Sequence, residues 1–289
     1  MKKLALTSLL AVFAISDANA ANVIDGNPLY MPKAGHFYSV TSLGSHTEGT
    51  PYALGEEFGY GVMDNLAVNV YTSLVEDKAF DEYGWEDLAI KATFRAYDDG
   101  AWKADVYGEY AASGYLFAHS DLLKLHPAVK DDHAWFEKEL LDYAWTLGVR
   151  GGYTTSQFTI AGHIEYGYGN TESFNWNEDK GFQGVHAMAF GLDGQFVIDP
   201  QWNLVAGVEY TGILDKELYG TPGAKIENAG IVEGYFGVNY NIDATKYVGA
   251  YINGTMNHWS GDDPVTPASE KGWGFEDGFG FGMKFGIDF

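Results

Sequence analysis

The chain of 289 residues has no cysteine, few basic residues and no long apolar run. Without cysteine, disulfides, thiolate metal ligands and thiol nucleophiles are all excluded. There are 17 Lys and Arg against 40 Asp and Glu, a formal net charge of −23, which argues against nucleic acid as a partner because phosphate binding requires clustered basic side chains. No segment reaches the roughly 18 uninterrupted apolar residues that a membrane-spanning helix needs.

The first twenty residues have the pattern of an export signal. Met1-Lys2-Lys3 is basic, Leu4 to Ile15 is a short apolar run, and Ala18-Asn19-Ala20 is a small-x-small cleavage site. We therefore expect residues 1–20 to be a cleaved signal peptide, with a retained anchor as the alternative. Residues 21–34, which include two prolines, are expected to form an irregular periplasmic lead-in or an inward plug.

The last eleven residues alternate large apolar side chains with small or polar ones. A period of two predicts a strand with Phe279, Phe281, Met283, Phe285, Ile287 and Phe289 on one face. Similar alternation recurs in segment after segment. The mean hydropathy is nevertheless slightly polar, at −0.18, although the chain has 20 Tyr, 18 Phe and 8 Trp. This combination is typical of strands that present one face to lipid and the other to a polar interior.

The terminal Phe289 carries a resemblance to a known family. This ending resembles the closing strand of Gram-negative outer-membrane β-barrels. The resemblance implies that Phe289 is an assembly signal read by the barrel-assembly machinery. It also implies a location in the cell outer membrane, in contact with lipid and lipopolysaccharide. In architecture alone, the chain is similar to twelve-stranded outer-membrane proteins, which include small channels and phospholipase A.

Short and long connections alternate along residues 35–289, as a transmembrane barrel requires. We expect an all-β fold, a closed antiparallel transmembrane β-barrel of twelve strands, with ten or fourteen as alternatives. Tight periplasmic turns are predicted at residues 64–65, 98–100, 154–156, 199–201 and 241–244. Extracellular loops are predicted near 44–52, 75–86, 112–140, 171–184, 215–225 and 259–274.

Aromatic residues near the predicted strand ends favour an interfacial girdle, because Tyr and Trp rings prefer the headgroup zone of a membrane. The alternative is the ordinary preference of aromatics for strands. The predicted girdle residues are Tyr60, Trp102, Tyr143, Tyr153, Tyr166, Trp202, Tyr210, Tyr240 and Tyr247.

The faces opposite the apolar ones are expected to line a lumen. The predicted lumenal acids are Glu57, Asp105, Glu109, Asp142, Glu165, Asp193, Glu209, Glu233 and Asp288, and the other ionisable lining residues are Lys91, Arg95, Lys103, Arg150, His163 and Lys284. The acids outnumber the bases, so an open lumen should favour cations. Glycines predicted on the inner face, at 148, 152, 167, 191, 207 and 237, favour free space, whereas salt-bridged side chains could instead plug a barrel of this size.

The predicted loop 112–140 is the longest and has helical signals. It could fold inward and constrict a pore, or lie on the barrel rim, which we favour slightly. Its His119, His126 and His133 recur every seven residues, but Pro127 interrupts any continuous helix, so solvated histidines are favoured over a metal site.

Acidic residues in other predicted loops offer a weak electrostatic site for divalent cations that bridge lipopolysaccharide phosphates, and a solvated acidic surface is the default interpretation. These residues are Glu48, Glu56, Asp262, Asp263, Glu270 and Glu276.

One pattern suggests catalysis. His258 and Ser260 resemble the His-x-Ser motif of outer-membrane phospholipase A and lipid A deacylase, in which a base must reach the serine nucleophile. The residues that follow, Gly261-Asp262-Asp263, depart from the phospholipase pattern, and no Asn follows to orient His258. The favoured interpretation is therefore that His258 and Ser260 lie at the membrane interface and that the protein is not an enzyme.

Three functions remain open from the sequence. The favoured one is a small channel that passes ions or small solutes through a mildly acidic lumen. The alternatives are a hydrolase of membrane lipids and a structural or adhesive barrel that displays acidic loops. No cofactor and no metal site is predicted.

Overall fold

The computed structural model describes residues 26–46, 53–77, 82–113, 142–171, 182–214, 216–217, 225–260 and 272–289, and most of them form strands. The strands are β1 (Phe37–His46), β2 (Ala53–Met63), β3 (Leu66–Asp77), β4 (Glu82–Asp98), β5 (Trp102–Ser113), β6 (Asp142–Thr154), β7 (Phe158–Thr171), β8 (Phe182–Val197), β9 (Trp202–Ile213), β10 (Lys216–Glu217), β11 (Lys225–Asn241), β12 (Lys246–Ser260) and β13 (Gly272–Asp288). In the described part of the chain, no helix is long and apolar enough to cross a membrane.

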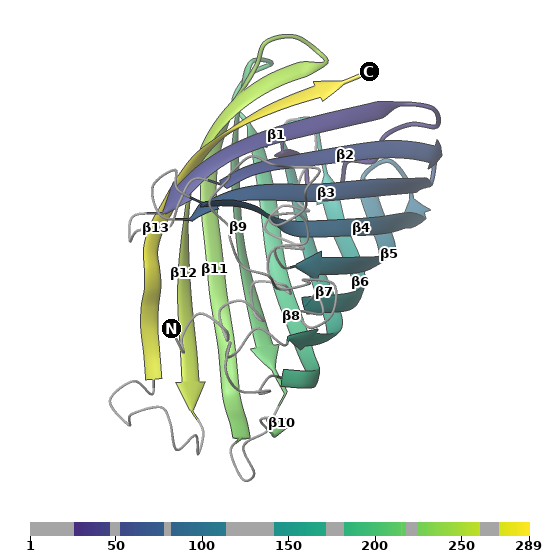
Figure 1. Ribbon diagram of the computed structural model, residues 1–289. Helices are drawn as coiled ribbons and strands as arrows, with labels where there is room; N and C mark the ends of the chain where they lie inside the picture. Colours follow the sequence, from purple (N-terminus) through teal and green to yellow (C-terminus); the bar gives the residue numbers. More distant parts are fainter. Residues whose placement is uncertain are drawn as a thin grey trace, which may run out of the picture.

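The strands close into a barrel. Each strand from β1 to β8 pairs antiparallel with the next, β9 pairs with β11, and β12 and β13 follow. The two-residue β10 pairs only with β11. The ring is closed by β1 and β13, which lie side by side in Figure 1. At the end of this seam, the Phe289 N–H donates to the Phe37 carbonyl at 2.8 Å. The predicted closed antiparallel barrel of twelve strands is therefore confirmed, with β10 as a small addition.

All five predicted tight turns connect strands at one end of the barrel, which we call the turn end. Residues 64–65, 99–101, 155–157, 198–201 and 242–245 separate β2 from β3, β4 from β5, β6 from β7, β8 from β9, and β11 from β12. At the opposite end, β4, β8 and β13 begin earlier than predicted, so the loops that precede them are shorter than the sequence indicated.

Aspartates stabilise these turns through their side chains. Backbone N–H groups of Ala101 and Trp102 donate to Asp99 Oδ1 at 3.1 and 2.7 Å. The bond from Trp102 is the main cause of a lowered Asp99 pKa, because it favours the ionised carboxyl. The contribution of this carboxylate to turn stability is therefore present above the unfolded pKa and is lost as pH falls through the lowered folded value.

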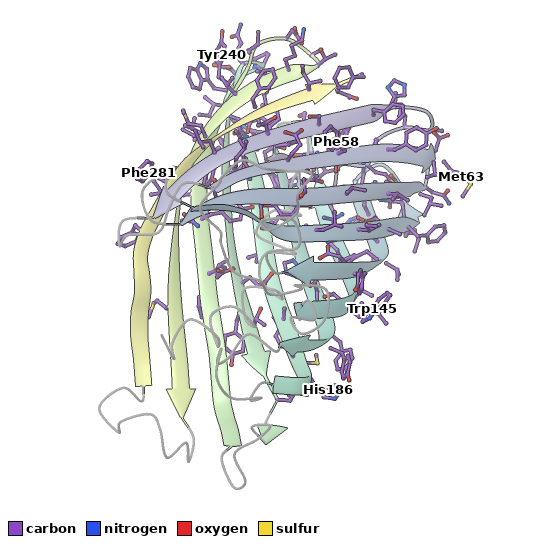
Figure 2. All side chains as sticks on the ribbon, in the orientation of Figure 1. Phe58, Met63, Trp145, His186, Tyr240 and Phe281 are labelled. Atoms are coloured by element: carbon purple, nitrogen blue, oxygen red, sulfur yellow. The ribbon has the colours of Figure 1, made fainter. Side chains whose placement is uncertain are left out.

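The outer surface of the barrel is apolar. Trp145, Leu147 and Phe281 are among many large apolar side chains that are more than half exposed. Figure 2 shows Met63, Trp145 and Tyr240 projecting away from the barrel wall. Near the turn end, aromatic rings pair across strands, as Trp202 does with Tyr240 at 4.9 Å between centroids. The prediction that Tyr247 belongs to the girdle is wrong. Its side chain is only 2% exposed, because it occupies an inner position on β12.

Glu56 is an exception on the outer surface. It was predicted to lie in an acidic loop, but it lies within β2, between the exposed Leu54 and Phe58. Its carboxylate accepts hydrogen bonds from the hydroxyls of Ser39 and Thr41 on β1, at 2.5 and 2.6 Å. These bonds supply partners for a charged group in an apolar region, where an unpaired carboxylate is costly.

Removing Phe289 is expected to reduce barrel formation, because the deletion removes both the terminal ring and the backbone hydrogen bonds with Phe37 at the end of the seam. Heat-modifiable migration on a gel measures the folded fraction. Phe289→Ala separates the two contributions, since it keeps the backbone and loses only the ring. Normal folding of the deletion variant would contradict the importance of this contact.

Candidate functional site

The inner wall of the barrel is polar and carries the candidate site. The predicted lining residues whose side chains are described occupy buried or half-buried positions in the strands. Glu57, Lys91, Arg95, Asp105, Glu109, His163 and Glu165 are buried, and Lys103, Arg150, Asp193, Glu209, Glu233, Lys284 and Asp288 are half-buried. Asp142 lies in β6 opposite Ser113, and its side chain is outside the described part. That these residues line a passage for solutes stays a prediction.

Basic residues gather on β4, β5 and β6 around one buried carboxylate. Arg95 Nε donates to Asp105 Oδ1 at 2.5 Å, and Arg150 Nη2 donates to Asp105 Oδ2 at 2.9 Å. Lys91 Nζ lies 4.1 Å from the centre of the Tyr107 ring, a cation–π contact. The described side chains of this arc are four bases, Lys91, Arg95, Lys103 and Arg150, beside three acids, Asp98, Asp105 and Glu109, so the arc has a small surplus of positive charge.

Acidic residues gather on the next arc, formed by β7, β8, β9 and β11. His163 on β7 lies between two of them, with Nε2 at 2.9 Å from Glu209 Oε2 and Nδ1 at 3.5 Å from Asp193 Oδ2. Glu209 also accepts a hydrogen bond from the Thr211 hydroxyl at 2.9 Å. Glu233 on β11 pairs in register with Glu209. The two arcs therefore separate the charges of the lumen around the ring.

A third polar group lies on β1, β2 and β3. The Tyr38 hydroxyl donates to Glu57 Oε1 at 2.5 Å, and Asn69 Nδ2 donates to the same oxygen at 2.8 Å. Across the seam, the Lys284 ammonium on β13 lies 5.1 Å from the Tyr251 ring centre. One carboxylate oxygen of the buried Glu57 is thus hydrogen-bonded from both neighbouring strands, which offsets part of the cost of burying its charge.

Rings on the inner wall lie flat over glycines of the neighbouring strand. Tyr107 on β5 crosses Gly148 on β6 and donates a hydrogen bond to Glu165 on β7. A Cβ added at Gly148 would lie 2.4 Å from the Tyr107 ring, closer than any real contact allows. The absence of a side chain on β6 therefore lets a residue of β5 reach a residue of β7.

The same arrangement occurs twice in the acidic arc. The His163 ring covers Gly191 on β8 and reaches Glu209 on β9, and a Cβ at Gly191 would lie 2.0 Å from that ring. In the opposite direction, Tyr235 on β11 covers Gly207 on β9 and donates to Asp193 on β8 at 2.9 Å. Tyr107 and Tyr235 were not predicted as site residues. They could have been identified by looking for inner aromatic residues that pair in register with a glycine on the neighbouring strand.

The interpretation of these glycines as free space is wrong at several positions. Rings fill the space at Gly148, Gly191 and Gly207, and Leu29 approaches Gly152. Gly167 differs, since with Thr146, Glu165 and three other residues it lines a niche of about 10 Å³. This volume is close to the minimum for one water molecule.

The remaining predictions concern residues that the structure does not settle. His258 and Ser260 lie near the end of β12, where His258 pairs with Gly230 and Trp273, but their side chains are outside the described part. The loop 112–140 and its three histidines fall almost entirely outside it. Among the described residues, no group of three or more His, Asp and Glu side chains could hold a metal ion.

Comparison with known proteins identifies the fold. No protein-family model matches the chain, and no curated protein matches it in sequence. Among solved structures, it is similar to the COG4313 outer membrane channel from Pseudomonas putida F1, with 12% identity, 90% of this chain and 97% of that chain covered, and a TM-score of 0.56. It is also similar to the NanC porin, with 7% identity, coverage of 87% and 98%, and a TM-score of 0.52. The chain thus has the barrel fold of small outer-membrane channels.

Gly191→Ala is expected to destabilise the barrel by about 1–3 kcal/mol, because the added methyl forces the His163 ring away from Glu209. The matched control is Gly194→Ala on the same strand, where a Cβ meets no atom closer than 3.7 Å. Thermal unfolding in detergent measures both. Equal unfolding midpoints for the two variants would show that the ring has room to move.

Proposed function

We propose that the protein is an outer-membrane channel that passes small ions or solutes, with a preference for cations. The observation that carries this proposal is the contrast between the two faces of one wall. Outside, exposed apolar side chains such as Leu147 and Phe281 suit lipid, and inside, the strands carry ionisable side chains. A barrel fold shared with an outer membrane channel and a porin supports the same function.

The balance of inner charge supports cation preference. The described inner wall carries eight acids and five bases, with His163 in addition. Asp105 is paired with two guanidinium groups. The acidic arc, in contrast, contains three carboxylates, those of Asp193, Glu209 and Glu233, and one imidazole, that of His163. A wall rich in carboxylates attracts cations into a water-filled passage, because the low dielectric constant of the surrounding protein focuses the field there.

The separation of charge into arcs adds a second property. Arg95 and Arg150 lie on strands that precede the acidic arc in the ring, so an electric field would run across the lumen. A solute with separated positive and negative groups would align with this field. Small dipolar solutes are therefore the class that this lining suits best.

The proposed location determines the partners. In the outer membrane, the turn end would face the periplasm, and residues 1–20 would direct export as a cleaved signal. The apolar outer surface would contact lipid and lipopolysaccharide, and the assembly machinery would recognise the strand that ends at Phe289. The barrel fold and the sequences at the two ends of the chain support these assignments.

In a planar bilayer with a KCl gradient, the protein is expected to give conductance steps with a reversal potential of the cation-selective sign. The double variant Glu209→Gln and Glu233→Gln should move the reversal potential toward zero, because it removes two inner negative charges from the acidic arc. Absence of steps from folded protein would contradict the channel.

Glu56→Gln is the matched control for this measurement. It removes one negative charge from the outer surface of β2, where Ser39 and Thr41 hold the carboxylate. Its reversal potential should equal that of the unchanged protein. An equal shift in the control and in the double variant would show that selectivity does not arise from the inner wall.

A further inference from the structure

Residues 26–32, called the lead segment below, lie inside the barrel near its turn end. Leu29 is 1% exposed, and Pro28 and Pro32 are also buried. The wall around these apolar side chains is the polar, inner face of the barrel. They therefore lie inside the barrel and not against its lipid-facing surface. The segment therefore occupies part of the lumen at this level.

The lead segment bridges two sides of the ring. A Cβ at Gly26 would lie 2.3 Å from Val205 on β9 and 3.0 Å from Asn239 on β11. Three residues later, the Leu29 carbonyl accepts a hydrogen bond of 2.7 Å from Arg95 Nη2 on β4. In ring order, β4 lies five or six strands away from β9 and β11. Three residues span at most about 11 Å, so the chain and the side chains that it touches bridge the lumen here.

Beyond Leu29, the chain turns back to the seam. The Leu29 N–H donates to the Asn27 side chain at 2.9 Å, and the Tyr30 N–H donates to the Asn27 carbonyl at 3.1 Å, which makes a tight turn around Pro28. The Tyr30 hydroxyl then donates to Asp288 on β13 at 3.2 Å. The lead segment is thus held by strands on three sides of the barrel.

The residues that follow fasten the segment to β2. The Gly35 N–H donates to the Gly61 carbonyl at 2.8 Å, and the Gly61 N–H donates to the His36 carbonyl at 3.0 Å. Ala34 donates to the Asp64 side chain at 3.2 Å in the first tight turn. This attachment fixes where the lead segment enters the barrel.

We propose that the lead segment forms the constriction of the channel and sets both its size limit and its charge selectivity. The proposal rests on the proposed function. The Leu29 carbonyl accepts a hydrogen bond from Arg95, which also pairs with Asp105. The segment therefore keeps one guanidinium group of the basic arc away from passing ions. Beyond the segment, ions then meet the carboxylates of the acidic arc further along β9 and β11, and cations are favoured.

Replacing residues 27–30 with Gly-Ser-Gly-Ser tests the constriction at constant chain length. The change removes the Asn27 turn and the Leu29 side chain, so the backbone carbonyl of position 29 is no longer held against Arg95. Single-channel conductance should rise by about twofold or more, since conductance follows the narrowest cross-section, and the reversal potential should move toward the anion-selective sign. The control is Lys33→Ala at an exposed position, which should change neither value. Unchanged conductance and selectivity in the Gly-Ser variant would overturn the proposal.

Thiol labelling tests the position of the lead segment without any transport measurement. The chain has no cysteine, so Leu29→Cys and Lys33→Cys each carry one thiol. In folded protein, a bulky maleimide should label Cys at position 33 at least tenfold faster than at position 29, and the two should label equally after unfolding. Equal labelling in the folded state would overturn the proposal.

The two experiments separate failure of the constriction from failure of the channel. If neither the unchanged protein nor the Gly-Ser variant conducts, the channel function fails, and protection of position 29 alone no longer supports a constriction. If only the Gly-Ser variant conducts, the lead segment closes the passage, so the unchanged protein is not an open channel, and both the proposed function and the constriction are overturned. If both conduct equally, the channel stands and the constriction is overturned.

Discussion

The hydrogen-bonded seam between β1 and β13 is the constraint on which the rest of the barrel depends. A sheet that presents apolar side chains on its outer face can lie in lipid only if no strand edge is left with unpaired N–H and C=O groups. The register from Tyr38 opposite Asp288 to His46 opposite Gly280 removes that edge. Once the ring is closed, side-chain alternation alone assigns each residue to lipid or lumen.

Closure then creates a crowded interior. Twelve strands enclose a limited cross-section, and charged groups on the inner wall must find partners within it. Tyr107, His163 and Tyr235 meet this requirement by lying along the wall over a glycine of the next strand, so that each reaches an acid two strands away. The lead segment contacts inner residues of β4, β9, β11 and β13 near the turn end.

Features with a local cause could be predicted from the sequence. Four of the five turns follow from Asp, Asn, Gly and Pro at short spacing, and the fifth follows from Thr and Ser at 154–156. The inner or outer position of most strand residues follows from a period of two. Tyr247 and Glu56 were misassigned because residue type was weighed above the alternation of their own strands. The contacts of Leu29 with Arg95 and of Tyr107 with Glu165 join residues 66 and 58 positions apart, and no local pattern encodes them.

The placement of rings over glycines has a consequence for how such a chain varies. Gly191 and His163 occupy one volume shared between two strands, as do Gly148 and Tyr107. A larger residue at either glycine is compatible with the fold only if the ring across from it becomes smaller. In related chains, the two positions of each pair should therefore co-vary, and such covariation would reveal strand order and register directly from aligned sequences.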